Sequence, residues 1–456
     1  MRVALLSEHA DPLAALGSSE AGGQNVHVGA LGTALAAAGH RVEIFTRRQS
    51  PEDPDVVTMA PGVDVVHVPA GPAEPVPRDD LLPLMPAFGA WLRHRWSTGP
   101  APDVVHAHFW MSGVAGLPVC RRLGIPFVQT FHALGSVKRR HQGDADTSPP
   151  GRRALELKLA RGADAVVATC SDEVDELARM GAGSARIRVV PCGVDLSVFG
   201  PDGPAWPRPA GGRHRIVCLS RLVERKGIDT MVAAMGRVKD ADLLVAGGPP
   251  TDRLTLDPDA RRLLERSMAW GVADRVQLLG RVDRADVPAL LRSADLLVTV
   301  PAYEPFGIVP LEAMACGIPV VASAVGGMLD TVTDGVTGVH VRPGDIAGLA
   351  RVVRELLADP RRRRDLGDAA AVAARRYSWR RVADETAAVY AAVCDGSGMD
   401  GAGVAAGGIG SDGIGSDGIG SDRIGSDRIG RRVGGSRGRA VARGGAGIGA
   451  TGVRAR

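Results

Sequence analysis

Short apolar runs alternate with amphipathic segments along most of this 456-residue chain. Runs such as RVALL (2–6) and DVVHAH (103–108) are typical of strands buried on both faces, and helical spacing follows them. This alternation predicts βαβ units that build parallel sheets. Strands are expected at residues 2–6, 41–46, 64–68, 103–108, 126–132, 164–169, 186–191, 215–220, 242–248, 275–280, 295–300 and 319–323.

A stretch rich in Pro and Gly, residues 191–213, interrupts this alternation. Its composition is typical of a linker, and 456 residues are too many for a single core. The expected fold class is α/β, with two doubly wound Rossmann-like domains that face each other across a cleft. They are expected at 1–195 and 214–375, with a linker at 196–213 and a C-terminal helix at 376–395 that crosses back to the first domain.

Residues 396–456 form a low-complexity tail rich in Gly and Arg, with a five-residue repeat at 409–428. So little apolar area predicts disorder. The GIGSDG at 408–413 has no strand before it and no helix after it, so we expect no dinucleotide cofactor. The nine Arg and five Asp of 397–456 account for the whole net charge of +4. This balance predicts weak tail contact with anionic surfaces, and the neutral body predicts no nucleic-acid partner.

The six cysteines are scattered without metal-ligand spacing, as is usual for reduced cysteines in a cytosolic protein. The first apolar run is too short for a signal peptide, and every run falls short of the roughly 18 residues that a membrane helix needs. We therefore expect a cytoplasmic protein, at most peripheral at a membrane.

Two acids eight residues apart, Glu304 and Glu312, stand out in PAYEPFGIVPLEAMACGIPVV (301–321). Paired carboxylates can hydrolyse glycosidic bonds, or they can simply be solvated charges. Here the loop PAYEPFG follows an expected strand and precedes a helix from about Ile308 to Gly317. The unpaired N–H groups at the start of that helix form an anion site. The two acids flank this turn, which favours a sugar nucleotide.

Two other segments support a phosphate site. SRLVERKG (220–227) places Arg221 and Lys226 after an expected strand, where they supply fixed positive charge for a leaving diphosphate without a metal. GSSEAGGQNV (17–26) is a Gly-rich turn that allows backbone to approach phosphate. Gly326-Gly327 is either a turn or a nucleotide contact. HAH (106–108) lacks a third metal ligand, so we expect no metal.

Together, these and further motifs resemble the retaining glycosyltransferases of family 4, which have the GT-B fold. The motifs are GGQNVHV (22–28), HAHFW (106–110), QTFHALGSVK (129–138), PCGVDLSVF (191–199), SRLVERKG (220–227) and EPFGIVPLEAMACGIPVV (304–321). The likeness covers about residues 1–393. It is nearest to the branch of sucrose-phosphate synthases and the inositol-phosphate glycosyltransferase of mycothiol biosynthesis.

The resemblance implies a metal-independent transferase that moves a sugar, with retention, from a nucleoside-diphosphate sugar to a hydroxyl acceptor. It implies catalytic roles for His132, Arg221, Lys226 and Glu304. It implies donor contacts from Gly23, Phe306, Gly307, Ile308, Val309 and Glu312. The alternative is a catalytically weak sugar-nucleotide binding or regulatory protein.

The acceptor side departs from the family pattern. The resemblance implies acceptor contacts from His9, Asn25, Arg78, Phe109, Ala133 and Arg153. Arg78 stands where the mycothiol enzyme has Lys, Phe109 where it has Tyr, and Ala133 where it has Thr. Two hydroxyl donors are thereby lost, and a buried phosphate needs its hydrogen bonds. We therefore expect a small hydroxylated acceptor other than inositol 3-phosphate.

Overall fold

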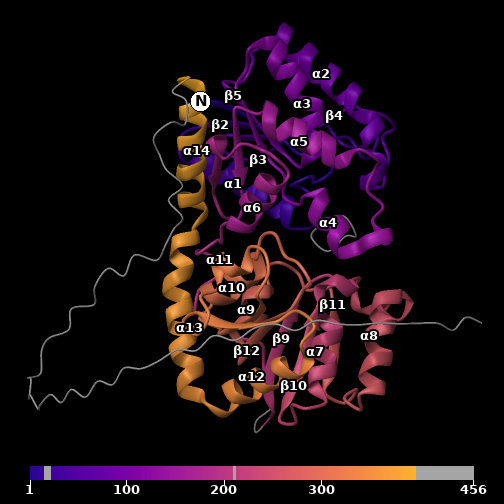
Figure 1. Cartoon of the computed structure of the whole chain (residues 1–456), viewed down its shortest axis with the longest axis vertical. Helices are drawn as coiled ribbons and strands as arrows, with labels where there is room; N and C mark the ends of the chain where they lie inside the picture. Colours follow the sequence, from indigo (N-terminus) through magenta and orange to yellow (C-terminus); the bar gives the residue numbers. More distant parts are fainter. Residues whose placement is uncertain (15–21, 209–211, 397–456) are drawn as a thin grey trace, which may run out of the picture. The chain divides into compact units, whose positions relative to one another are not determined.

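The computed structural model describes residues 1–14, 22–208 and 212–396. The first domain is built on an eight-stranded sheet with strand order β3-β4-β2-β1-β5-β6-β7-β8 (Figure 1). Its neighbouring strands are parallel apart from the antiparallel pair β3 and β4. The strands are β1 (Arg2–Leu6), β2 (Arg41–Arg47), β3 (Val56–Ala60), β4 (Val63–Val68), β5 (Val104–His108), β6 (Phe127–Thr130), β7 (Ala165–Ala168) and β8 (Ile187–Val189).

Helices cover both faces of this sheet because successive strand residues point to opposite sides. Ala4 and Leu6 of β1 join a core with α2 and α3, whereas Val3 and Leu5 join a core with α1. The helices are α1 (Gly23–Ala37), α2 (Met85–Thr98), α3 (Trp110–Leu123), α4 (Gly135–Gln142), α5 (Arg152–Gly162) and α6 (Ser171–Arg179), with short 3-10 turns η1 (Arg78–Asp80), η2 (Leu82–Leu84), η3 (Gly143–Ala145) and η4 (Ser184–Arg186).

The second domain has a six-stranded parallel sheet with strand order β11-β10-β9-β12-β13-β14. Its strands are β9 (His214–Leu219), β10 (Ala241–Ala246), β11 (Val276–Gly280), β12 (Leu296–Thr299), β13 (Val320–Ser323) and β14 (Gly338–Val341). One face packs against α7 (Ile228–Met235), α8 (Pro258–Ala269) and α12 (Ile346–Ala358). The other packs against α9 (Val287–Arg292), α10 (Ile308–Ala315) and α13 (Pro360–Ala374). Two doubly wound α/β domains are thus confirmed.

The remaining elements of the second half are η5 (Glu224–Lys226), η6 (Thr251–Leu256), α11 (Met328–Thr331) and η7 (Arg375–Tyr377). The last helix, α14 (Trp379–Cys394), packs against α1 of the first domain (Figure 1). Val382, Ala383 and Tyr390 are buried in the same core as Leu31 of α1. The Ser378 hydroxyl caps this helix by accepting a hydrogen bond from the Arg381 N–H.

The sequence pattern did not predict the strands β3 and β14, and several predicted strands are shorter in the structure. β3 lies at a sheet edge and is partly exposed, so its apolar signal is weak, and β14 contains Gly and His. The strand expected at 126–132 ends at Thr130, because His132 adopts a φ of 60° that leaves the extended region. The tail and residues 17–21 of the Gly-rich turn lie outside the described residues.

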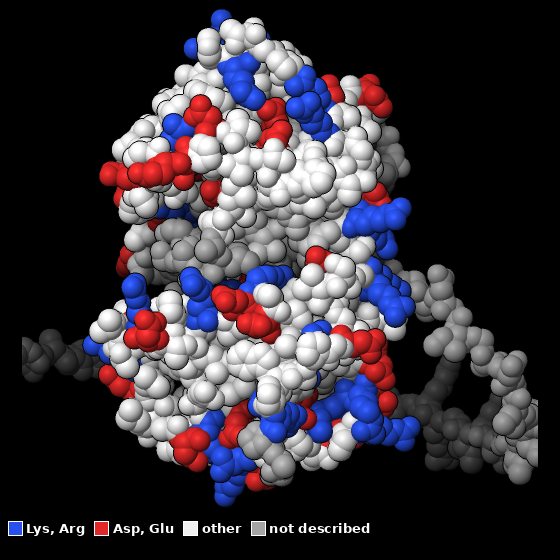
Figure 2. Space-filling view, turned by 180° about the vertical axis from the view of Figure 1, so that it is seen from behind, with Lys and Arg blue, Asp and Glu red and all other residues white. Residues whose placement is uncertain are grey.

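Acidic and basic side chains are interspersed on the face shown in Figure 2. None of the helices in residues 1–14, 22–208 and 212–396 is both long enough and apolar enough to span a bilayer.

Gly227, between η5 and α7, lies in close contact with the backbone of the loop that follows β12. Its φ is 72°, and an added Cβ would lie 1.9 Å from the Val300 carbonyl oxygen. Gly124 has a φ of 70°, but a Cβ there would meet nothing within 4 Å. Gly124→Ala should lower the free energy of unfolding by about 1 kcal/mol through backbone strain alone. Gly227→Ala should lower it by at least about 2 kcal/mol more, because backbone must also move. Equal urea midpoints for the two variants would contradict this expectation.

Candidate active site

A cavity of about 280 Å³ lies where strands of both sheets end. His9, Phe109 and His132 follow the ends of β1, β5 and β6. Ser220 and Glu304 follow β9 and β12 in the second domain. Ligands of open parallel sheets bind beyond these carboxyl ends. The lining residues are His9, Gly22, Gly23, Gln24, Asn25, Arg78, Phe109, His132, Ala133, Leu219, Ser220, Arg221, Arg225, Lys226, Thr299, Glu304, Pro305, Phe306, Gly307, Ile308, Val309, Pro310 and Met328.

An ion pair between Lys226 and Glu304 joins two loops of the second domain at this cavity. The Lys226 ammonium donates a hydrogen bond to the Glu304 carboxylate, and the side chains are only 17% and 14% exposed. Burial lowers the pKa of Lys226, although Glu304 opposes this shift. Burial is the largest influence and acts to raise the pKa of Glu304, but the charge and hydrogen bond of Lys226, the charge of Arg225 and the Phe306 N–H together outweigh it, so the net pKa lies below the usual value. Glu304 is therefore a carboxylate in contact with a cation.

The start of α10 contributes backbone to the same cavity. Gly307 has a φ of 70° and directly precedes the helix, whose first N–H groups have no partner within the helix. The Gly326-Gly327 turn lies against this loop: the Gly327 N–H donates to the Glu304 carbonyl at 2.9 Å. A Cβ on Gly326 would lie 2.3 Å from that carbonyl oxygen. Close backbone packing in this turn therefore explains the glycine pair without a nucleotide contact.

Glu312 is not among the residues that line the cavity. Its side chain is 1% exposed, and its carboxylate pairs with the Arg284 guanidinium at 2.5 Å. Burial raises the pKa of Glu312, and Arg284 opposes that shift. Arg284 also lies over the Phe199 ring at 4.6 Å. The structure thus separates the two acids that the sequence analysis placed on either side of one anion site.

Four histidines form a buried cluster, of which His132 also lines the cavity. His108 Nδ1 lies 2.9 Å from His132 Nε2, and the rings of His27 and His132 are 5.1 Å apart. Burial lowers the pKa of His27 to about 4 and that of His106 to about 3. It lowers the pKa of His108 and His132 well below the usual value. All four imidazoles are therefore neutral at pH 7.

His106 links this cluster to the last helix. Its Nδ1 lies 2.7 Å from the Tyr390 hydroxyl and its Nε2 lies 2.8 Å from Thr130 Oγ1. Thr130 Oγ1 donates its proton to the Val167 carbonyl, so His106 Nε2–H donates to Thr130 and the Tyr390 hydroxyl donates to Nδ1. In the described part of the chain, no group of three or more His, Cys, Asp or Glu is arranged to hold a metal ion.

Two guanidinium groups and the His9 ring lie around Phe109, on the side of the cavity formed by the first domain. The Phe109 ring centroid lies 4.8 Å from that of His9, and the guanidinium carbons of Arg78 and Arg152 lie 5.9 and 5.2 Å from its ring. Arg152 also donates to the Ala133 carbonyl at 2.6 Å. Cation–π contact fixes the ring in this position.

Arg153 does not line the cavity. Its side chain is exposed on α5, because the next residue of a helix points about 100° away from the previous one. Arg152 does not line the cavity either, so the acceptor contact expected of Arg153 stays a prediction. Arg152 is the buried member of the pair and lies beside Phe109 and Ala133. The signal available for it was the spacing Arg152–Glu156, which is an (i, i+4) ion pair at 2.8 Å in the structure.

Other sequence-predicted residues do meet at the cavity. Gly23 opens α1, and a Cβ there would lie 3.6 Å from side-chain atoms of both Phe306 and Ile308. Asn25 also lines the cavity, where it closes the start of α1 by accepting from the Gly22 N–H at 3.0 Å. The remaining predicted residues that line the cavity are Arg221, Gly307 and Val309.

Comparison with known proteins agrees with this architecture. The family model Glycosyltransferase Family 4 matches residues 21–198, and the model Glycosyl transferases group 1 matches residues 207–372. A D-inositol 3-phosphate glycosyltransferase of Xylanimonas cellulosilytica is 41% identical over 409 residues, which cover 86% of this chain and 96% of that protein. The D-inositol 3-phosphate glycosyltransferase of Mycobacterium tuberculosis strain H37Ra is 39% identical over 401 residues, or 85% of this chain and 82% of that protein.

Among solved structures, the sucrose-phosphate synthase of Thermosynechococcus elongatus superposes with a TM-score of 0.81 at 33% identity, covering 87% of this chain and 99% of that one. The chain therefore belongs to glycosyltransferase family 4. It is a nucleotide-sugar glycosyltransferase with the GT-B fold, as the sequence motifs indicated.

The buried histidines should make the fold sensitive to acid. Since the pKa of His27 falls from 6.5 to about 4 on folding, the unfolded chain binds a proton in this window that the folded chain excludes. The free energy of unfolding should therefore fall as pH falls from 6.5 to 4, by about 1.4 kcal/mol per pH unit for each such histidine, with no slope from them above 6.5. Urea unfolding at several pH values measures this slope. His27→Gln should reduce it by about one proton, and His94→Gln, at an exposed position, should not.

Proposed function

We propose that this transferase retains the configuration of the sugar, needs no metal, and moves a hexosyl group from a nucleoside-diphosphate sugar to a small hydroxylated acceptor. The observation that carries the proposal is the Lys226–Glu304 pair beside the start of α10. Together with Arg221 and Arg225, it gathers fixed positive charge and unpaired N–H groups in one cavity. A leaving diphosphate needs this kind of stabilisation, which guanidinium and ammonium groups supply.

The acceptor and donor would meet between the two domains. The departing β-phosphate oxygen takes the proton of the acceptor hydroxyl on the same face of the sugar, which gives retention. The protein then acts by positioning and by stabilising charge. His132 Nδ1 is buried and has no hydrogen-bond partner among the described residues, and the residue lines the cavity. A neutral imidazole at this position can form a hydrogen bond with a hydroxyl group of the donor sugar.

Lys226→Met tests the leaving-group role. The donor is first identified by a thermal-shift panel of nucleoside-diphosphate sugars. Losing the ammonium should lower kcat by about a hundredfold or more. It should also lower stability, because the buried Glu304 carboxylate loses its partner. A double variant with Glu304→Gln separates the two effects, and Lys239→Met, at an exposed lysine, is the control.

The same assay tests retention and metal independence. The anomeric configuration of the product, read by proton NMR, should match that of the donor, and EDTA should leave the rate unchanged. An inverted product or a rate abolished by EDTA would overturn the corresponding part of the proposal. Binding of the sugar nucleotide by the parent chain without turnover would favour a regulatory protein.

The curated relatives act on D-inositol 3-phosphate by name, so this acceptor is the sharpest test of the acceptor side. Phe109 and Ala133 present a ring and a methyl group to the cavity instead of hydroxyl donors. Each missing donor costs about 1–3 kcal/mol for a buried anion, so inositol 3-phosphate should bind weaker by roughly two to four decades. An acceptor competition assay measures this. Saturation and glycosylation at micromolar inositol 3-phosphate would show that the expectation is wrong.

A further inference from the structure

A buried carboxylate lies directly behind the acceptor side of the cavity. Glu8 follows β1, is 0% exposed, and places Oε1 2.8 Å from His9 Nδ1. Its second carboxylate oxygen accepts from the Ser112 hydroxyl of α3, and the Glu8 N–H donates to the same hydroxyl oxygen at 3.1 Å. Among the described residues, His9 is the ion-pair partner of Glu8. The Glu8 carboxylate is therefore held by both His9 and Ser112.

This contact decides which nitrogen of His9 carries the proton. A carboxylate can only accept hydrogen bonds, so the hydrogen between the two groups belongs to Nδ1. In the neutral ring, Nε2 is then left with a lone pair. The His9 side chain is 10% exposed, lines the cavity, and rests edge-on against Phe109. Its ring is thus fixed in tautomer by Glu8 and in orientation by Phe109.

We propose that Glu8 is a positioning residue that presents His9 Nε2 as a hydrogen-bond acceptor to a hydroxyl of the sugar acceptor. This inference rests on the proposed function only in placing the acceptor on this side of the cavity. The bond orients the acceptor without transferring a proton, so the leaving phosphate still receives the proton of the reacting hydroxyl. Glu8 acts through His9 and does not touch the substrate.

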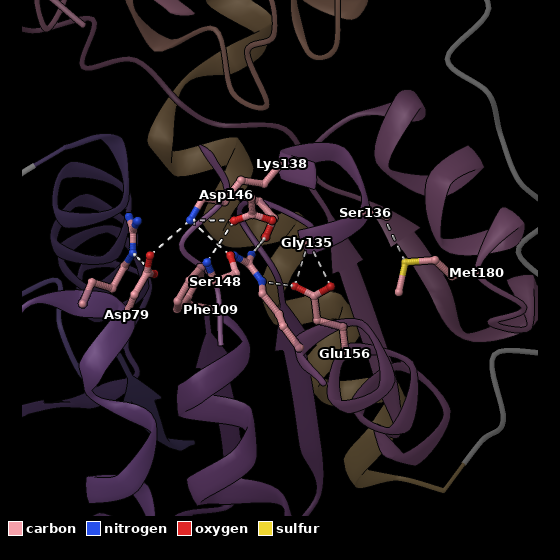
Figure 3. Close-up of polar contacts among 12 residues, drawn as sticks. Asp79, Phe109, Gly135, Ser136, Lys138, Asp146, Ser148, Glu156 and Met180 are labelled. Atoms are coloured by element: carbon pink, nitrogen blue, oxygen red, sulfur yellow. Dashed lines mark hydrogen bonds and ion pairs between the residues drawn. The ribbon is translucent and has the colours of Figure 1, made fainter. Parts of the chain in front are cut away.

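The groups around His9 also favour an uncharged acceptor. Phosphate oxygens offer no hydrogen to a nitrogen lone pair. Lys138, which is near Arg78, already contacts Asp79 at 3.2 Å and Asp146 at 3.1 Å. Figure 3 shows these contacts beside Ser148, which lies 3.1 Å from the Lys138 ammonium.

The guanidinium group of Arg152 likewise already has hydrogen-bond partners. Its side chain is 4% exposed, and its Nε donates to Glu156 at 2.8 Å while another nitrogen reaches Ser148 Oγ at 3.1 Å. Among the described residues, the other cation on this side of the cavity is Arg78, which lies 3.5 Å from Asp79. A polyol that offers hydroxyl hydrogens fits this set of groups better than a phosphorylated one.

The tautomer is measured directly by nitrogen-15 NMR of histidine-labelled full-length protein at pH 7.5, with His9→Asn to assign the signals. In the parent chain, Nδ1 of His9 should carry the proton and Nε2 should resonate as an unprotonated nitrogen. Glu8→Leu, and Glu8→Gln as a shape-preserving second variant, should move the proton to Nε2. A parent His9 that is protonated on Nε2, alone or on both nitrogens, would overturn the proposal. This result needs no substrate.

Kinetic measurements distinguish a positioning role of Glu8 from a purely structural one. With a donor that the parent chain uses, Glu8→Leu should lower kcat/KM for an acceptor at least about tenfold. Slow hydrolysis of the donor by water should stay within about twofold, and Glu355→Gln, at an exposed glutamate, should change neither. Equal loss of both activities would show a structural role and contradict the proposal. A parent chain that turns over no nucleotide sugar would instead refute the proposed function.

Myo-inositol and inositol 3-phosphate serve as matched acceptor probes that differ by one phosphate. The parent chain should favour myo-inositol, and Glu8→Leu should lose that preference. A parent preference for the phosphorylated probe that Glu8→Leu leaves unchanged would overturn the assignment.

Discussion

The arrangement of the second domain depends on adjacent parallel strands, β9 and β12, ending at the same sheet edge. The loop after β9 carries Lys226 and the loop after β12 carries Glu304, so their ion pair closes the site from two directions. The Ala302 N–H also donates to the Arg225 carbonyl at 2.9 Å, which ties the two loops through backbone. Without this register, neither the cation nor the start of α10 would face the cavity.

Much of this fold could be predicted because each buried parallel strand is a local apolar run. The loops that carry Arg221, Lys226 and Glu304 follow such runs, so their place at the carboxyl ends follows from topology. What could not be predicted are partners distant in sequence. Glu312 pairs with Arg284, and Glu8 with Ser112, through contacts that no spacing records. Which of Arg152 and Arg153 is buried also could not be predicted, since moving a helix start by one residue rotates every side chain by about 100°.

The two halves of the cavity use charge in different ways. On the proposed donor side, Arg221, Arg225 and Lys226 lie near Glu304, which is the carboxylate that lines the cavity in the described part of the chain. On the acceptor side, carboxylates already pair with Lys138 and Arg152, and the histidines behind the cavity are neutral. A sugar diphosphate and a polyol present this same contrast, one anionic and one rich in hydroxyls. The family fold is thus shared, whereas the proposed acceptor chemistry rests on a few side chains around Phe109.

The hydrogen bond from Tyr390 to His106 has a consequence for how the chain is made. Helix α14 comes from the end of the described sequence, yet Val382 and Tyr390 complete the core that α1 and β1 begin. The first domain is therefore discontinuous. During synthesis, which proceeds from the N-terminus, its first 195 residues emerge with one sheet face covered by α1 but not yet by α14, and with His106 lacking the Tyr390 hydroxyl. The nascent domain must wait for the whole second domain to be translated before its own interior can close.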